Sequence, residues 1–443
     1  MNHAATIEDV RDADGRPTAA LPFTHLLRLS AYWLGLTAID SAVGLVVQYR
    51  VNFGDLVDTL EVGRALAFIG VGGVVISVIV QPTIGAISDY TVSRWGRRKP
   101  WIVIGSALDV VFLLAIAYSN SILAIAAFVA LLSFSTNIAR GPFQGYVPDL
   151  VPARQVGTAS ALVGLMQILG NVTGFMLANA AAALDNLPLA LIAVALVELV
   201  TMISVVWRVG RGQPPKPRDG KSWRSIAREA WGTDILQERS FVWLVASRLF
   251  FLMGGGILFN LVVAYLKQVF GLSQEEAAGV NTILLVIVAV TNVIVILPAA
   301  RLSDRVGRKP VIYASCVIGG AGIGLAALAP AIPVAIVGAS LFGVSAGMFL
   351  SVDWALMTDI IPKASAGRYM GLSNVATGTS GLLAVTTGAL MMDAVNIAFG
   401  VGTGPRAAFL LGLAYYVVAA ILLRPVKEPP ASARGQVTET VAA

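Results

Sequence analysis

The sequence predicts an all-α membrane protein in which twelve transmembrane helices form two pseudo-symmetric six-helix halves. The first observation is composition: 57% of the 443 residues are hydrophobic, 13% are charged, and the mean hydropathy is +0.79. A soluble protein carries about 25% charged residues, so this chain cannot cover a water-exposed surface. The composition therefore excludes a soluble enzyme, a disulfide scaffold and a nucleic-acid-binding protein.

The second observation is a regular succession of apolar segments, most of them close to the ~20 residues that a helix needs to cross a bilayer. One long polar stretch, 209–239, divides them into two sets of six. The twelve predicted spans are 26–49, 64–88, 100–120, 122–148, 155–184, 187–208, 240–266, 277–300, 310–329, 332–361, 368–392 and 405–424.

The positions of the basic residues predict which side each loop faces, because Lys and Arg concentrate in cytoplasmic loops. With both termini in the cytoplasm, almost all of the 31 Lys and Arg fall on that side. The exceptions are Arg50, Arg64, Lys267 and Arg406 outside, and Arg140 and Arg248 within spans. The predicted regions are a cytoplasmic tail at 1–25, halves at 26–208 and 240–424, a central cytoplasmic loop at 209–239, and a cytoplasmic tail at 425–443.

The third observation is an internal repeat. Residues 96–100 read GRRKP and residues 307–310 read GRKP, while 149–152 read DLVP and 359–362 read DIIP. Parallel six-helix repeats are one architecture of membrane transporters, with the solute site at the midplane between the halves. A constant offset of 210 relates Arg98/Arg308, Pro100/Pro310, Asp149/Asp359, Pro152/Pro362, Gly157/Gly367 and Leu162/Leu372.

The residue inventory limits the chemistry. His3 and His25 are the two histidines, and Cys316 is the single cysteine. An intrachain disulfide and a Cys/His zinc site are therefore excluded. The sequence also lacks a GxxxxGK[ST] phosphate-binding loop, which argues against an ATP-driven pump. We predict no enzyme activity, no cofactor and no bound metal.

Two loop motifs resemble the signature of the major facilitator superfamily. The first copy follows the second span and the other follows the eighth, and the resemblance extends over the membrane portion of the chain. It implies the major facilitator fold, transport by alternating access, and a central cavity lined by helices 1, 4, 7 and 10. The first copy contains Ser88, Asp89, Gly96, Arg97 and Arg98, and the second contains Ser303, Asp304, Arg305, Gly307, Arg308 and Lys309.

Two stretches narrow the resemblance to the sucrose/proton symporters and the wider glycoside-pentoside-hexuronide symporter group. These are RWGRRKPWIVIG at 94–105 and GPFQGYVPDL at 141–150. The chain departs from that group at two functional positions. The acidic residue implicated in proton coupling corresponds to Ser133, and an arginine implicated in sugar binding corresponds to Gln144, with Arg140 one turn earlier.

Each of the four helices that the resemblance places at the cavity carries one charge within its span. They are Asp40, Arg140, Arg248 and Asp353 on helices 1, 4, 7 and 10. A charge at the bilayer centre costs at least ~2.5–3.5 kcal/mol, so each needs a partner or a wet cavity. Asp40 and Asp353 are candidate proton or cation sites, and the alternative is that Asp40–Arg140 and Arg248–Asp353 are structural ion pairs.

Further predictions concern the helix ends and the neutral side chains. We expect Asp149 and Asp359 to form cytoplasmic salt bridges with the signature arginines, in a network that includes Asp89 and Asp304. Asp109 and Glu198 lie on peripheral helices, and we favour snorkelling or a local pair over a functional role for them. The segment Trp223–Trp231 has two interpretations: a short amphipathic helix on the inner membrane face, or a plain solvated linker. The neutral candidates for binding a sugar include Asn137, Gln144, Asn260 and Trp354, together with Tyr32, Trp33, Gln48 and Phe251.

The functional prediction is a secondary active transporter that moves a sugar or glycoside by proton-coupled symport. Alternatives are a carrier of organic anions held by Arg140 and Arg248, an exporter of drug-like compounds, and a non-transporting receptor or assembly factor. The expected partners are the solute, H⁺ (with Na⁺ as the alternative ion) and the lipid bilayer, and we expect a functional monomer. We predict a multi-pass protein of the inner (plasma) membrane with both termini cytoplasmic.

Overall fold

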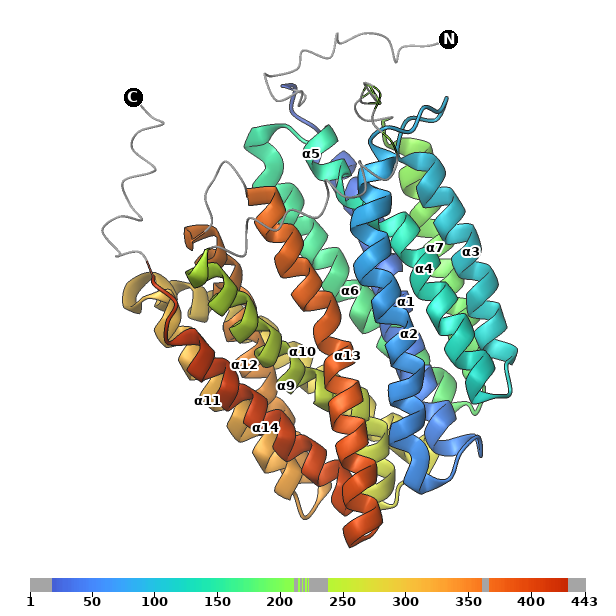
Figure 1. The fold of residues 1–443 in the computed structure, drawn as a ribbon, viewed down its shortest axis with the longest axis vertical. Helices are drawn as coiled ribbons and strands as arrows, with labels where there is room; N and C mark the ends of the chain where they lie inside the picture. Colours follow the sequence, from blue (N-terminus) through green and yellow to red (C-terminus); the bar gives the residue numbers. More distant parts are fainter. Residues whose placement is uncertain are drawn as a thin grey trace. The chain divides into compact units, whose positions relative to one another are not determined.

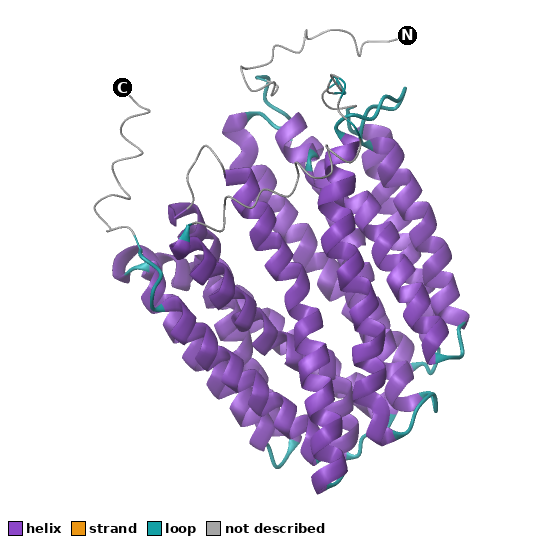
Figure 2. Ribbon diagram, in the orientation of Figure 1, coloured by secondary structure: helices purple, strands orange, loops and turns teal. Residues whose placement is uncertain are grey.

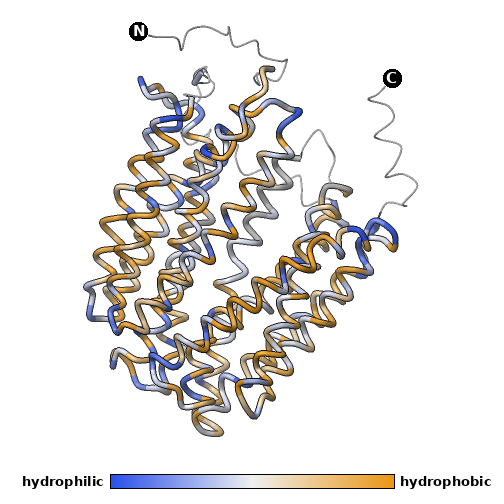
Figure 3. Tube along the Cα trace, turned by 180° about the vertical axis from the view of Figure 1, so that it is seen from behind, coloured by the Kyte–Doolittle hydropathy of each residue, from blue (hydrophilic) through white to orange (hydrophobic). Residues whose placement is uncertain are grey.

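The computed structural model describes residues 18–210, 214–215, 217, 220, 222, 238–360 and 366–428. The described chain is built from helices, without β-strands, as Figure 2 shows. Hydrophobic residues occupy most of each long helix, while hydrophilic residues gather near the helix ends and in the turns (Figure 3). The amphipathic segment predicted at Trp223–Trp231 lies outside the described residues.

Twelve helices of 20 or more residues follow one another along the described chain, in the predicted succession (Figure 1). Eleven of them are long and apolar enough to cross a membrane, and α2 occupies the remaining predicted span. They are α1 (Phe23–Phe53), α2 (Val62–Ser88), α3 (Lys99–Tyr118), α4 (Ile122–Gln144), α6 (Val156–Ala183), α7 (Leu187–Arg208), α9 (Arg239–Phe270), α10 (Gln274–Val306), α11 (Arg308–Leu328), α12 (Ile332–Ile360), α13 (Ala366–Phe399) and α14 (Thr403–Leu423).

The fourth predicted span, 122–148, is divided in the structure. Helix α4 ends at Gln144, and after Gly145 a short helix α5 (Tyr146–Leu150) begins. Pro142 lies in the last turn of α4 and has no backbone N–H to continue the hydrogen-bond ladder. The absence of a side chain at Gly145 leaves room for the Arg98 guanidinium, since a Cβ on Gly145 would lie 1.9 Å from Arg98 Nη1.

Local sequence signals account for several helix ends. Ser121 caps α4 by accepting a hydrogen bond from the backbone of Ala124, and Ser273 forms a capping box with Glu276 at the start of α10. At the C-terminal end of α9, Gly271 takes the left-handed conformation that terminates a helix. These caps hold the helix ends where the predicted polar turns lie.

The chain divides into two compact units. The first unit comprises Met1–Val46 and Gly72–Trp231, and the second comprises Val47–Val71 and Gly232–Ala443. The end of α1 and the beginning of α2 therefore belong to the second unit, although they lie in the first predicted half. Hydrogen bonds also join these segments to the rest of the second unit: Gln48 Nε2 donates to the carbonyl of Phe259 at 2.9 Å, and Asp393 accepts from the backbone N–H of Gly63 at the start of α2.

In the first unit, α3 packs against α4 and α7, and α6 packs against α7. Aromatic and aliphatic side chains of α1, α3, α4, α6 and α7 form its core, with the Tyr32 and Phe143 rings edge to face at 4.9 Å. In the second unit, α12 packs against α10 and α11, and α9 packs against α13 and α14. The Phe251 and Phe349 rings stack at 3.7 Å within it.

Candidate functional site

The first intramembrane ion pair joins α1 and α4. Arg140 Nη2 lies 2.5 Å from Asp40 Oδ2 and 3.5 Å from the carbonyl oxygen of Leu36, one turn earlier on α1. The Asp40 side chain is half-exposed, whereas that of Arg140 is mostly buried. The sequence-predicted charges are therefore brought together, and the carboxylate keeps an open face.

The second intramembrane ion pair joins α9 and α12. Arg248 Nη1 forms a salt bridge with Asp353 Oδ2, and Arg248 Nε donates to Thr377 Oγ1 at 3.1 Å. The ring of Trp354 lies 5.4 Å from the guanidinium carbon of Arg248, at a cation–π distance. Both charged side chains of this pair are buried.

The two asparagine candidates bond to their own helices, whereas Gln48 and Tyr32 bond to other helices. Asn137 Nδ2 donates to the carbonyl of Ser133, and Asn260 Nδ2 donates to that of Gly256, each at 2.7 Å and four residues earlier. Asn137 Oδ1 is buried and accepts no hydrogen bond within the described part of the chain. Gln144 is half-buried at the end of α4. Compared with these neutral side chains, the two intramembrane ion pairs are the stronger candidates for contacts with a polar solute.

The first signature motif forms a buried network at one end of the first unit. Both oxygens of Asp149 lie 2.7 Å from Arg97 Nη2, and Arg98 Nε donates to Asp149 Oδ2 at 2.7 Å. Asp89 lies 3.1 Å from Arg98 and 3.8 Å from Arg97. Gly96 precedes the two arginines at φ +96°, a backbone conformation that favours glycine. The predicted bridges from Asp149 and Asp89 to Arg97 and Arg98 are present.

The second signature motif is more open. Arg308 Nη1 donates to Asp304 Oδ1 at 2.7 Å and to Ser303 Oγ at 2.5 Å, and Gly307 takes φ +101°. Arg305 is exposed. The side chain of Asp359 lies outside the described residues, so its predicted bridge stays a prediction.

Sequence analysis assigned no contact to Lys99 and Lys309, two lysines of the repeated motifs that are related by the same offset of 210. Lys99 Nζ donates to the carbonyls of Val206 and Val209 at the end of α7, at 2.8 and 2.7 Å. Lys309 Nζ donates to the carbonyls of Arg424 and Val426 at the end of α14, at 3.0 and 2.7 Å. A cation is favourable at a helix C-terminus, where carbonyls lack partners in the helix. The repeated Gly-Arg-Lys-Pro motif carries this signal.

Asp393 is a further residue that sequence analysis did not identify. Its two carboxylate oxygens accept from the backbone N–H groups of Gly63 and Arg64, at 2.8 and 2.7 Å. A Cβ on Gly63 would lie 2.0 Å from the carbonyl oxygen of Ala389, so α2 and α13 approach closely there. A carboxylate at a helix N-terminus meets the positive end of the helix dipole. No sequence motif marks this long-range contact.

Asp109 on α3 and Glu198 on α7 lie together at the middle of their helices. Both side chains are fully buried, so neither snorkels to an interface as one sequence interpretation proposed. The two carboxyl groups are within hydrogen-bonding reach of each other, which agrees with the local-pair interpretation. Helices α3 and α7 pack face to face, and this packing brings the two acids together.

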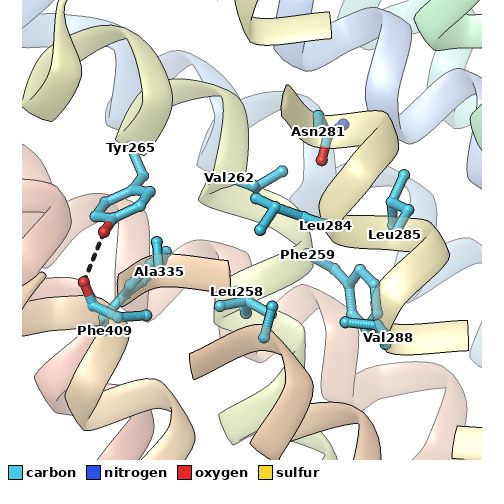
Figure 4. A pocket seen from close by; sticks show the side chains of 12 residues that line it. Leu258, Phe259, Val262, Tyr265, Asn281, Leu284, Leu285, Val288, Ala335 and Phe409 are labelled. Carbon is cyan, nitrogen blue, oxygen red and sulfur yellow. Dashed lines mark hydrogen bonds between the residues drawn. The ribbon is translucent and has the colours of Figure 1, made fainter. Parts of the chain in front are cut away.

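The second unit contains an apolar pocket among α9, α10, α11, α12 and α14 (Figure 4). Aliphatic side chains and the Phe259 ring line most of it, and the Tyr265 hydroxyl donates to the carbonyl of Ala326 at 2.6 Å. The lining holds no charged side chain, so the pocket offers little to a polar solute. Within the described residues, no group of three His, Cys, Asp or Glu could hold a metal ion.

Comparisons with known proteins agree with this architecture. The family model described as Major Facilitator Superfamily matches residues 30–385 and 278–442. A bacterial homologue of the human lysosomal transporter Spinster, in an inward-facing and occupied conformation, has a TM-score of 0.71 at 14% identity, covering 91% of this chain and 97% of that one. The nucleoside transporter NupG gives 0.63 at 15% identity, covering 90% and 98%. At these identities the likeness concerns the fold alone.

Plant sucrose transport proteins are among the curated relatives of this chain. SUT1 of Oryza sativa subsp. japonica is 30% identical over 142 residues, which are 27% of this chain and 26% of the relative. SUC3 of Arabidopsis thaliana is 29% identical over 142 residues, covering 27% and 24%. SUT4 of Oryza sativa subsp. indica is 27% identical over 190 residues, covering 38% and 31%. The matched stretches span about a quarter to a third of these relatives.

Proposed function

The chain belongs to the major facilitator superfamily, and on this premise we propose that it transports a sugar or glycoside together with a proton by alternating access. It is a multi-pass membrane protein with many apolar helices. The sucrose transport relatives support a sugar as the solute, although they match only part of the chain. We further propose a monomer in the inner membrane, with both termini cytoplasmic and H⁺ rather than Na⁺ as the coupling ion.

The observation that carries the proposal is the Asp40–Arg140 pair in the first unit. An ion pair inside a membrane protein is costly unless it is used or well compensated. Here the Asp40 carboxylate is half-exposed, so a solute hydroxyl can donate a hydrogen bond to it without a rearrangement of buried side chains. Arg140 presents a planar array of N–H donors beside it, which suits the acceptor oxygens of a sugar. The pair therefore offers both a donor and an acceptor.

The test uses purified protein in liposomes that contain a pH-sensitive dye. Sucrose, maltose and other glycosides are added in turn, and internal acidification is recorded. We expect one of these sugars to acidify the lumen, and we expect Asp40→Asn and Arg140→Gln to abolish the signal. The matched control is Asp185→Asn, which neutralises an exposed carboxyl in the turn between α6 and α7. Loss of the signal in that control, or silence with every sugar, would contradict the proposal.

The second candidate function is transport of an organic anion. Arg248 favours it, because this buried arginine has Trp354 beside it and could hold a carboxylate in place of Asp353. The same liposomes distinguish the two functions when carboxylates replace sugars. An anion carrier should respond to a carboxylate, fail to respond to sugars and lose solute binding in Arg248→Gln.

A further inference from the structure

Two carboxyl groups in the first unit have the geometry of a shared proton site. Asp109 Oδ1 accepts from the hydroxyls of Ser135 and Thr136, the latter at 2.9 Å. Glu198 Oε1 accepts from the Tyr32 hydroxyl at 3.2 Å. The second oxygens, Asp109 Oδ2 and Glu198 Oε2, are buried and receive no donor from the described residues. The carboxyl groups themselves lie within hydrogen-bonding reach of each other.

Two ionised carboxylates in contact inside a dry site are strongly disfavoured, because their repulsion and their desolvation are both unfavourable. A hydrogen bond between two carboxyl groups also needs a hydrogen, since two carboxylate oxygens are both acceptors. One proton held between the pair satisfies both requirements. It gives each orphaned oxygen a partner and reduces the buried charge to a single negative.

Close helix packing keeps the pair dry and in register. A Cβ on Gly35 would lie 2.9 Å from Glu198 Cα, so α1 and α7 are in backbone contact beside one acid. A Cβ on Gly105 would lie 2.8 Å from the carbonyl oxygen of Ser135, so α3 and α4 touch beside the other. Four helices therefore fix the position of the two carboxyl groups.

The pair is electrostatically linked to the proposed solute site. Arg140 interacts electrostatically with Asp109, and the same guanidinium group forms the salt bridge with Asp40. Thr136, which donates to Asp109, lies one turn before Arg140 on the same face of α4. Arg140 Nε is buried and has no hydrogen-bond partner within the described residues, so the guanidinium has a donor to give.

We propose that Asp109 and Glu198 form the proton-binding site of this protein and that Arg140 couples the site to solute binding at Asp40. The inference rests on the proposed proton-coupled transport. A proton from water binds between the two carboxyl groups and returns to water on release. Without the proton, the pair has a second negative charge and draws Arg140 away from Asp40. The titratable and charged groups that face the pair are Tyr32 and Arg140, and Asp40 faces Arg140 in turn.

The first experiment separates coupling from transport. Wild type, Asp109→Asn and Glu198→Gln are placed in liposomes with radiolabelled sucrose as the probe. One measurement follows exchange of sucrose at equal pH and concentration on both sides, and the other follows accumulation driven by a proton gradient. We expect both variants to lose accumulation and to retain exchange, because the solute site is intact and the proton site is not.

The matched control is Asp185→Asn, which should retain both activities. Asp185 has φ +50°, a conformation that asparagine adopts readily, so the control makes the same chemical change without strain. Accumulation that survives in both test variants would overturn the proton assignment and leave the transporter proposal standing. Loss of exchange as well as accumulation would reduce the pair to a structural role. Absence of sucrose exchange in wild type would instead count against the proposed function.

A second experiment tests the site without a solute. Infrared difference spectra of the purified protein in lipid, recorded between neutral and alkaline pH, where exposed carboxyl groups stay ionised, detect the carbonyl stretch of a buried neutral carboxyl group. We expect this band in wild type and in Asp353→Asn, and its loss in the double variant Asp109→Asn/Glu198→Gln. The proposal is overturned if the band is missing from wild type, or if Asp353→Asn removes it while the double variant keeps it.

Discussion

The two halves of the sequence contain the same two features, an intramembrane ion pair and a signature motif, but they differ in which of the two is buried. In the first half the intramembrane pair is open, with Asp40 51% exposed, and the signature aspartate is mostly buried, with Asp89 20% exposed. In the second half the intramembrane pair is closed, with Asp353 2% exposed, and the signature pair is open, with Asp304 63% exposed. Equivalent residue types therefore differ in burial, and burial decides whether an ion pair is enclosed or accessible.

The comparison gives its largest expected effect at the two signature motifs. Asp149→Asn removes the carboxylate that both Arg97 and Arg98 bond, and breaking a buried pair costs about 3–5 kcal/mol. Asp304→Asn breaks an exposed bridge and should cost less than about 1 kcal/mol. Thermal unfolding of the two purified variants measures the difference. Equal losses would mean that burial does not decide the cost of removing a carboxylate that pairs with a signature arginine.

The two intramembrane pairs should differ in the same direction by a somewhat smaller amount. Asp353→Asn leaves Arg248 buried without its carboxylate and should lower stability by about 3 kcal/mol. Asp40→Asn affects a half-exposed pair, and we expect a loss of about 1 kcal/mol or less. The unfolding temperatures of the two purified variants, each compared with wild type, measure these losses.

The double variant Arg248→Met/Asp353→Leu sharpens this second comparison. Replacing both members of a buried pair by apolar side chains is often neutral for stability. We therefore expect the double variant to unfold near the wild-type temperature and to be more stable than Asp353→Asn. A double variant as unstable as the single one would show that the loss does not come from an uncompensated charge.

A glycine tests how tightly the first signature network is packed. Gly145→Ala would place a Cβ 1.9 Å from Arg98 Nη1 and displace this arginine from Asp149. Overpacking of this kind costs about 1–3 kcal/mol. The matched control is Gly157→Ala on α6, where a Cβ meets nothing within 4 Å. The prediction fails if the two variants unfold at the same temperature.

The lysines at the helix ends give the smallest expected difference. Lys99 is buried and bonds two carbonyls at the end of α7, so Lys99→Met should cost up to about 2 kcal/mol. Lys309 makes the equivalent contacts from a partly exposed position, and Lys309→Met should cost about 0.3–1 kcal/mol. Unfolding curves of the two variants at low ionic strength measure which substitution costs more stability. A larger loss from Lys309→Met than from Lys99→Met would contradict the prediction.

The sequence by itself determined the helix succession and the inventory of charges. Membrane helices must satisfy their backbone groups internally, so apolar length alone located the spans. The cost of a charge within a membrane span distinguished Asp40, Arg140, Arg248 and Asp353 by their positions in the sequence. The offset of 210 also related the two signature motifs, since repeated sequence implies repeated structure.

Only the tertiary structure decided which acids meet and which pairs are buried. Asp109 and Glu198 are 89 positions apart in the sequence, and the packing of α3 against α7 brings them together. The closeness of Asp393 to the start of α2 is likewise a long-range contact without a local signal. The two intramembrane pairs have the same composition, yet one is open and one is closed. Burial depends on the side chains that surround a residue in space, and the order of residues along one helix does not specify them.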